Sequence, residues 1–224
     1  MVVRCRNLAR RGWRSRIIEP MSVPGRVAAA ALLMSVQPPP WHLRHVRAVA
    51  EIAAWLAFRA ASAGRPVDRA LVESAALLHD IDKVLPPGDP VRALPHGAGS
   101  AAWLTARGHA ELAPAVTGHP VTRLASPGAD AWLDRATPEE LIVAYADKRA
   151  GQRREPMASR FDDWTRRYPA TATWHGWSNE EATAVRRRAA RLEQLACDLA
   201  GVAPEAVERL PWTARALATA RAAG

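Results

Sequence analysis

Apolar residues in this chain recur at helical spacing between short proline-rich breaks, and this pattern limits the fold more than any other feature. From residue 41 to 63 one helical face is apolar, formed by Val46, Val49, Ile52, Ala53 and Leu56. Three prolines at 38–40, and four prolines with a glycine at 84–95, cannot lie inside a helix. Alanine is abundant and β-branched runs are few, which favours helix over strand. We therefore predict an all-α protein, a compact helical bundle with a C-terminal helical extension.

Helix boundaries follow from capping signals as well as from the breaks. Thr137-Pro138-Glu139-Glu140 and Ser178-Asn179-Glu180-Glu181 each place a glutamate three residues after a capping side chain. Asp68 is a further N-cap, for a helix that ends near His79. Residues 120–136 are predicted as a mixed loop with at most a short helix. The predicted helices are 22–36, 41–63, 68–79, 97–107, 110–118, one from Thr137 through Asp147, 156–168, 178–200 and a short one after Pro211.

Length and charge indicate one domain with a basic tail. A chain of 224 residues with 49% apolar residues can build a core. The formal charge is +9, but residues 1–20 contain six arginines and one acid, which gives +5 and leaves +4 for the other 204 residues. This distribution indicates a solvated tail and does not favour nucleic acid as a partner. We expect a disordered basic tail or a segment before the true start codon at 1–21, the main domain at 22–170, and the extension packed on it at 171–224.

The sequence gives only a weak indication of export, the twin-arginine pair Arg10-Arg11, and none of a membrane span. The apolar run at residues 27–34 is short and has no clear cleavage site after it. No stretch approaches the ~20 apolar residues that cross a bilayer. Cys5 and Cys197 lie far apart in unlike surroundings, so a disulfide framework is not expected. We therefore expect a cytoplasmic protein without a membrane partner.

The segment Leu-Leu-His-Asp-Ile-Asp-Lys at 77–83 sets His79 and Asp80 side by side at the end of an apolar helix. A helix end relaxes the separation of adjacent helical side chains, so an imidazole and a carboxylate can converge there. Such a pair suits Fe, Mn, Co, Ni or Zn, whereas Mg or Ca prefers oxygen ligands alone. Four further candidates lie near predicted helix ends or on apolar faces: His45, His96, His119 and Asp147. Together these residues predict a site for one or two divalent transition metal ions.

Three motifs surround these residues: His-x-x-x-Val-Ala at 45–50, Leu-Leu-His-Asp-Ile-x-Lys at 77–83 and Ala-Asp-Lys at 146–148. In order and context they resemble the HD superfamily of metal-dependent phosphohydrolases, over about residues 41–168. With its two extra histidines the chain is similar to the dinuclear branch, which includes small bacterial diadenosine tetraphosphate hydrolases. The resemblance implies an HD-domain bundle in which one ion is held by His45, His79, Asp80 and Asp147. It also implies that Asp80 bridges to a second ion, held by His96 and His119.

This resemblance is incomplete at three points. No His-His-Glu or Gly-Tyr-Pro motif follows, which argues against the branch that degrades cyclic-di-GMP. Asp82 stands where glycine is common in the same loop. His42, one turn before His45 on the same helical face, is a rival ligand that could instead line the pocket.

Basic residues near the candidate ligands indicate a phosphorylated substrate. The chain has two lysines among its 31 basic residues, and each follows a predicted ligand, Lys83 after Asp80 and Lys148 after Asp147. Chance placement in an arginine-rich chain is the alternative explanation. We expect catalytic roles for Asp80 and Lys83, because bound ions activate water and a lysine can neutralise the transferred group. Substrate contacts are expected from Lys83, Lys148, Arg149, Arg153 and Arg160.

The predicted activity is hydrolysis of a phosphate ester or anhydride by metal-activated water, with a nucleotide or dinucleotide as the favoured substrate. Two alternatives use much the same ligand set: a di-iron HD oxygenase, and an HD domain that binds a nucleotide without turning it over. A serine or cysteine hydrolase is not favoured, since neither Gly-x-Ser-x-Gly nor a cysteine near a histidine occurs. The sequence leaves open the substrate, the native metal and the oligomeric state, a homodimer included.

Overall fold

The structure is a computed structural model that describes residues 23–167 and 177–210. These residues form eleven α-helices and three short 3-10 helices, and no strand, which confirms the predicted all-α class. The α-helices are α1 (Arg26–Ser35), α2 (Pro40–Ser62), α3 (Arg69–Leu78), α4 (Ala98–Thr105), α5 (Ala113–Gly118), α6 (Val121–Ala125), α7 (Ala129–Leu133), α8 (Pro138–Lys148), α9 (Met157–Arg167), α10 (Asn179–Ala200) and α11 (Pro204–Glu208). The 3-10 helices are η1 (Ile81–Lys83), η2 (Pro90–Ala93) and η3 (Ala110–Leu112).

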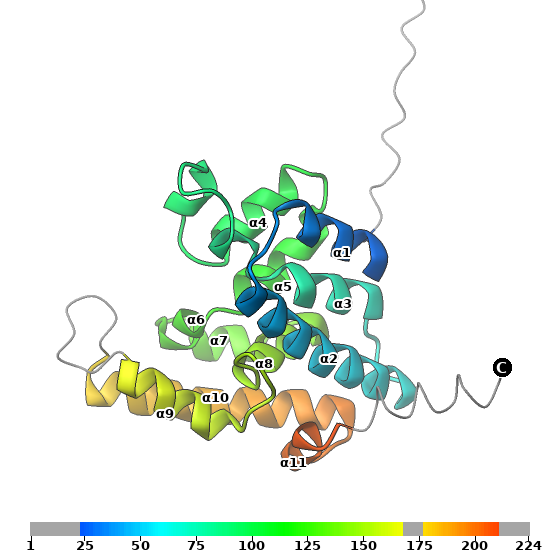
Figure 1. The fold of residues 1–224 in the computed structure, drawn as a ribbon. Coiled ribbons are helices and arrows are strands. Elements are labelled where there is room, and N and C mark those ends of the chain that lie inside the picture. The colour runs from blue at the N-terminus through cyan, green and yellow to red at the C-terminus, as the bar shows by residue number, and fades with distance from the viewer. Residues whose placement is uncertain (1–22, 168–176, 211–224) are drawn as a thin grey trace, which may run out of the picture.

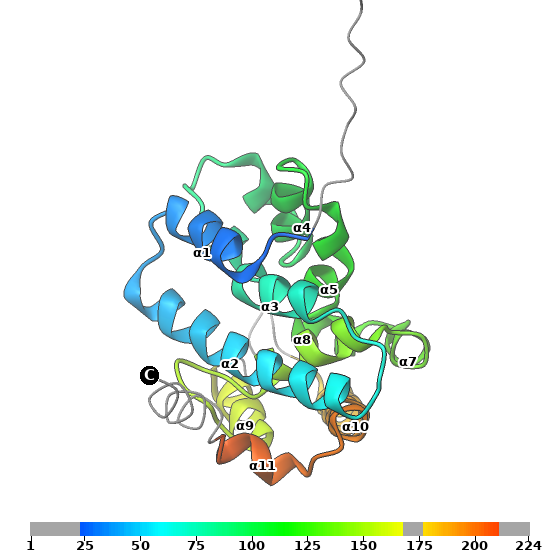
Figure 2. The same ribbon diagram turned by 90° about the vertical axis from the view of Figure 1, so that its right-hand side faces the viewer.

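The helices α2, α3 and α8 form the centre of the bundle, and each packs on the other two. Figures 1 and 2 show α1 and α4 toward one end of the bundle and α9, α10 and α11 toward the opposite end. Fully buried Ile52, Leu78, Ile142 and Leu192 come from α2, α3, α8 and α10 and join in one apolar core. The helix α10, which follows the bundle in the chain, therefore packs against it as predicted.

Local signals fix the helices that carry the candidate ligands. Asp68 caps α3 by accepting a hydrogen bond of 3.0 Å from a backbone N–H of its first turn. Thr137 forms the predicted capping box with Glu140 at the start of α8. Proline at the first helical position begins both α2 and α8. The helices α3 and α8, whose starts are fixed in this way, carry several of the predicted ligands at their C-terminal ends.

The segment between α5 and α8 differs from the prediction, because residues 120–136 contain two short helices, α6 and α7. Trp132 anchors α7, since its Nε1 donates to Oε1 of Glu140 at 3.1 Å and its ring packs against Gly118. From α10, Nη2 and Nε of Arg188 donate to Oδ2 of Asp130 at 2.8 and 3.0 Å. The helical conformation of this segment therefore depends on contacts between residues distant in sequence, which cannot be predicted from residue periodicity.

Several predicted features fall on residues that the structure does not describe: the tail at 1–21, Cys5, the start of the extension and the helix after Pro211. The short helix α11 was not predicted. None of the helices in the described part of the chain combines the length and the apolar character needed to cross a bilayer.

Candidate metal centre

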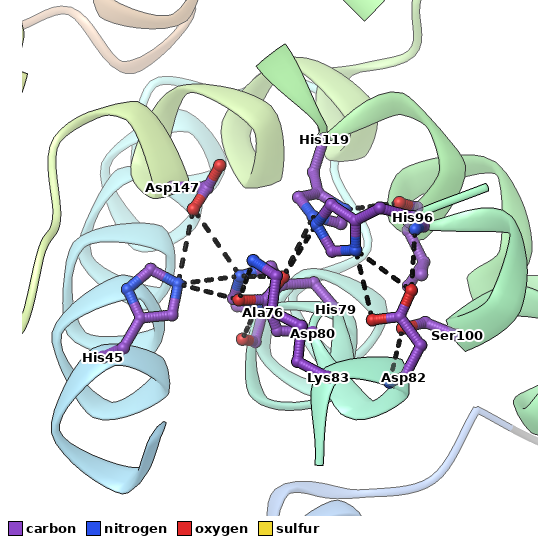
Figure 3. A network of polar contacts seen from close by, with 12 residues as sticks. His45, Ala76, His79, Asp80, Asp82, Lys83, His96, Ser100, His119 and Asp147 are labelled. Atoms are coloured by element: carbon purple, nitrogen blue, oxygen red, sulfur yellow. Dashed lines mark hydrogen bonds and ion pairs between the residues drawn. The ribbon is translucent and has the colours of Figure 1, made fainter. Parts of the chain in front are cut away.

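All six predicted ligands converge on one region between α2, α3, α5 and α8 (Figure 3). They are His45 on α2, His79 and Asp80 directly after α3, His96 just before α4, His119 directly after α5, and Asp147 in the last turn of α8. Two of the histidines, His79 and His119, are helix C-caps. Because the chain leaves helical geometry at these points, consecutive side chains can turn toward a common centre.

The first ligand group consists of His45, His79, Asp80 and Asp147. Nε2 of His45 lies 3.2 Å from Nε2 of His79. The same atom lies 3.3 Å from Oδ2 of Asp80 and 3.4 Å from Oδ1 of Asp147. Ligand atoms bound about 2.0–2.2 Å from one transition metal ion lie roughly 2.9–3.5 Å from each other at right or tetrahedral angles. The spacings of His45 therefore fit the donors of a single ion, and those from Nε2 of His79 to Oδ1 of Asp80 and of Asp147 are slightly longer, at 3.6 and 3.7 Å.

The second ligand group shares Asp80 with the first. Oδ1 of Asp80 lies 3.1 Å from Nε2 of His96 and 3.3 Å from Nε2 of His119, and the two nitrogens are 3.0 Å apart. When His96 and His119 are neutral, with the proton on Nδ1, this buried oxygen accepts no hydrogen bond within the described residues. An unsatisfied buried carboxylate oxygen is costly, and a cation among these donors would satisfy it. The residues present therefore fit a second ion, and Asp80 would contribute an oxygen to each of the two ions.

Hydrogen-bond acceptors hold all four histidines with Nε2 turned toward the cluster. The acceptors of Nδ1 are the Gly151 carbonyl for His45 at 2.8 Å, the Ala76 carbonyl for His79 at 2.8 Å, the Val116 carbonyl for His119 at 2.5 Å, and the Asp82 carboxylate for His96 at 3.0 Å. Because carbonyls and ionised carboxylates only accept, Nδ1 keeps its proton and Nε2 is the atom left for an ion. The rings are thus oriented for metal binding by the fold itself.

The two lysines of the chain contact the cluster from different sides. Nζ of Lys83 donates to Oδ2 of Asp80 at 2.8 Å, and the Lys83 side chain is 43% exposed. Lys148 is fully buried, and its Nζ donates to Oδ2 of Asp147 at 2.6 Å and to the backbone carbonyl of His119. Lys83 can therefore meet a substrate, whereas Lys148 ties α8 to the end of α5.

A cavity of about 790 Å³ opens on the cluster. Four predicted ligands form part of its wall: His45, Asp80, His96 and Asp147. Among the predicted substrate contacts, the wall includes Lys83, Arg153 and Arg160. Three tryptophans also line it, Trp41 from α2, Trp164 from α9 and Trp177 just before α10. The cavity thus joins the metal ligands to basic and aromatic side chains.

Two of the predicted substrate contacts lie elsewhere. Arg149 is buried and directed into the fold, where its Nη1 donates to Oη of Tyr145 and to Oε1 of Glu193, both at 2.8 Å. It follows Lys148 at the end of α8, and the rotation of about 100° per helical residue turns it toward α10. Lys148 does not line the cavity either, because its ammonium is enclosed among backbone and ligand groups. A substrate contact from Arg149 or Lys148 is therefore not supported.

His42 lies one turn before His45 on α2 but belongs to neither ligand group. It is buried, and neither ring nitrogen has a hydrogen-bond partner within the described residues. Burial lowers the pKa of His42 to about 4, so its ring is neutral near pH 7. The geometry therefore favours His45 over His42 as the ligand.

Metal binding is expected to tighten as the pH rises from neutral to about 9. Burial alone would lower the pKa of His45 and His96. Nearby carboxylates, Asp80 for both rings with Asp147 for His45 and Asp82 for His96, outweigh burial and raise each pKa to about 9. Below that pH an ion must displace a proton from its histidine, so its affinity should rise about tenfold per pH unit. Titration of the metal-free protein with Co²⁺ at several pH values checks this, and an affinity that is constant over the range would contradict it.

Comparison with known protein families agrees with this geometry. Residues 43–151 match the HD domain family. All six predicted ligands lie within the matched residues, whereas Arg153 and Arg160 follow them. No curated protein and no solved structure gives a match to the chain. This part of the chain is therefore similar to an HD domain, and it contains two groups that could hold a metal ion, His45 with His79 and Asp80, and Asp80 with His96 and His119.

Proposed function

We propose that the HD domain at residues 43–151 hydrolyses a phosphate ester or anhydride with water activated at its metal centre. The observation that carries this proposal is the shared carboxylate of Asp80, whose two oxygens face different histidines at the wall of a cavity. When bound, ions in such a centre lower the pKa of a coordinated water and polarise phosphoryl oxygens. The mixed imidazole and carboxylate donors suit one or two divalent ions of Fe, Mn, Co, Ni or Zn.

Basic side chains beside the centre match the charge of a phosphoryl group. Lys83 lies on the cavity wall and contacts Asp80, so its ammonium can neutralise charge on the transferred group. Arg160 lies on the same wall, and its buried Nε has no hydrogen-bond partner within the described residues. A phosphate oxygen would satisfy that donor. We assign charge neutralisation to Lys83 and substrate orientation to Arg160.

The walls of the cavity favour a nucleotide or dinucleotide within this substrate class. A volume of about 790 Å³ lies in the range of small-molecule sites. Trp41 and Trp177 line the cavity together with Arg153. Indole faces can stack on a base while the cationic side chains meet phosphates. This combination supports a substrate that carries both an aromatic ring and a phosphate chain.

Metal content and phosphate release, measured across nucleotides, dinucleotides and simple phosphomonoesters, test the proposal. Transition metal is expected to co-purify, and turnover should stop with a chelator and return with added metal. Hydrolysis without oxygen uptake rejects a di-iron oxygenase, which would use much the same ligands. Tight nucleotide binding after chelation, with no product from any compound, would favour a non-catalytic domain. A protein that binds no metal overturns the proposal.

Replacing Lys83 by methionine is expected to lower kcat by about 10²–10³-fold with metal content unchanged. The substitution removes a cation at the cavity wall and leaves every predicted ligand in place. Lys83→Arg, which keeps the charge, should recover part of the activity. Arg47→Met, at an exposed position on α2 outside the cavity, is the control. Equal activity in Lys83→Met and the control would contradict the role of Lys83.

A further inference from the structure

Asp82 is a buried carboxylate that contacts the second ligand group without belonging to it. Its Oδ2 and Oδ1 lie 3.0 and 3.1 Å from Nδ1 of His96. On its other edge the His96 ring places Nε2 3.1 Å from Asp80. The imidazole is therefore held between two carboxylates, one on each ring nitrogen (Figure 3).

The residues after His96 make room for this contact. The backbone N–H of Gly97 donates to Oδ2 of Asp82 at 3.0 Å, and the backbone N–H of Asp82 donates to Oγ of fully buried Ser100 at 3.1 Å. Gly97 has a φ of 82°, a left-handed conformation that favours glycine. A Cβ on Gly99 would lie 3.1 Å from Cβ of Asp82. Two glycines and a serine thus form a close-fitting support for the Asp82 side chain.

His96 depends on this support more than the other three histidines do. Its side chain is 34% exposed, whereas those of His45, His79 and His119 are at most 10% exposed. The other three rings are enclosed, and each donates to a backbone carbonyl. His96 donates to a side chain only, at the open edge of the cluster. Without Asp82 the ring could rotate into solvent, and the second group would lose a donor.

We propose that Asp82 is a positioning residue that holds His96 in place for the second ion, so that occupancy of the second ligand group depends on Asp82. The inference rests on the metal centre of the proposed function. A carboxylate behind a metal-binding imidazole fixes the ring orientation and makes Nε2 a stronger donor. The first ligand group has no contact with Asp82 among the described hydrogen bonds and ion pairs, so its affinity should not depend on this residue.

Co²⁺ binding to the metal-free protein tests this inference without any substrate. Wild type is expected to bind two equivalents, with visible absorption bands that report each step. Asp82→Ala should weaken the second step by about 10–100-fold and leave the first unchanged. His96→Ala, which removes a donor atom itself, should weaken the second step at least as much. Asp82→Asn should fall between wild type and Asp82→Ala, because its amide oxygen still accepts from Nδ1 but carries no charge. Asp134→Asn, at an exposed position after α7, is the control.

Each remaining outcome bears on the proposal. A second step of wild-type affinity in Asp82→Ala, or parallel weakening of both steps in Asp82→Asn, overturns it, and so does a wild-type protein that binds one ion. Parallel weakening would mean that Asp82 supports the fold and not His96. If Asp82 controls the second ion but no phosphate compound is hydrolysed, the proposed function fails while this inference stands.

Discussion

Asp80→Ala is expected to remove both ions and to lower kcat/KM for the phosphate substrate by at least about 10³-fold. Asp80 is the predicted ligand that the two groups share: Oδ2 lies 3.3 Å from Nε2 of His45, and Oδ1 lies 3.1 Å from Nε2 of His96. Its loss removes the shared carboxylate from both groups and leaves Asp147 as the one carboxylate among the predicted ligands, too little negative charge to offset two cations. Elemental analysis of the purified variant and its rate of phosphate release measure the effect.

The matched comparison is Asp80→Asn, which keeps the shape of the side chain and removes its charge. It should retain the fold, judged by its circular dichroism, and still lose at least one ion. Asp134→Asn makes the same chemical change at an exposed position and should retain both ions and full activity. Two ions and normal turnover in Asp80→Asn would show that Asp80 does not bridge the centre.

Most of the fold could be predicted because its signals are local. The helix predicted at 41–63 is observed as Pro40–Ser62, since the proline break and the apolar period both lie within the segment itself. The capping boxes at Thr137 and Ser178 were predicted from four residues each and are present. By contrast, α6 and α7 have five residues each, too few to show a helical period. They depend on contacts such as Arg188 with Asp130, which only the tertiary structure reveals.

In the site, the type and position of the ligands could be predicted from the sequence, whereas the direction of individual side chains could not. The six candidate ligands could be chosen by chemistry and by their places at helix ends or on apolar faces, and the structure brings them together. Arg149 also follows a ligand closely, yet its side chain turns into the fold because it lies one residue beyond Lys148. For Asp82 the sequence alone indicates no more than an unusual residue in its loop. The segment His-Gly-Ala-Gly-Ser at 96–100 was the available signal, because its glycines permit the close approach of that carboxylate.

Lys148→Met is expected to lower the free energy of unfolding of the metal-free protein by about 3–5 kcal/mol. The Lys148 ammonium is fully buried and donates to Asp147 and to the carbonyl of His119. Methionine fills similar space but leaves the buried Asp147 carboxylate without its nearest cation. Since an ion in the first ligand group supplies positive charge beside Asp147, added metal should recover part of the loss. Urea denaturation with and without metal measures both effects.

The only other lysine of the chain provides the control for this prediction. Lys83→Met makes the same chemical change beside Asp80, but the Lys83 side chain is 43% exposed. Water can replace the Lys83 ammonium, so the loss of stability should be on the order of 1 kcal/mol. Equal losses in the two variants would mean that burial of the Lys148 charge is not what stabilises the junction of α5 and α8. A large loss confined to Lys148→Met would instead assign the two lysines different tasks, one in the fold beneath the metal centre and one at the cavity that faces the substrate.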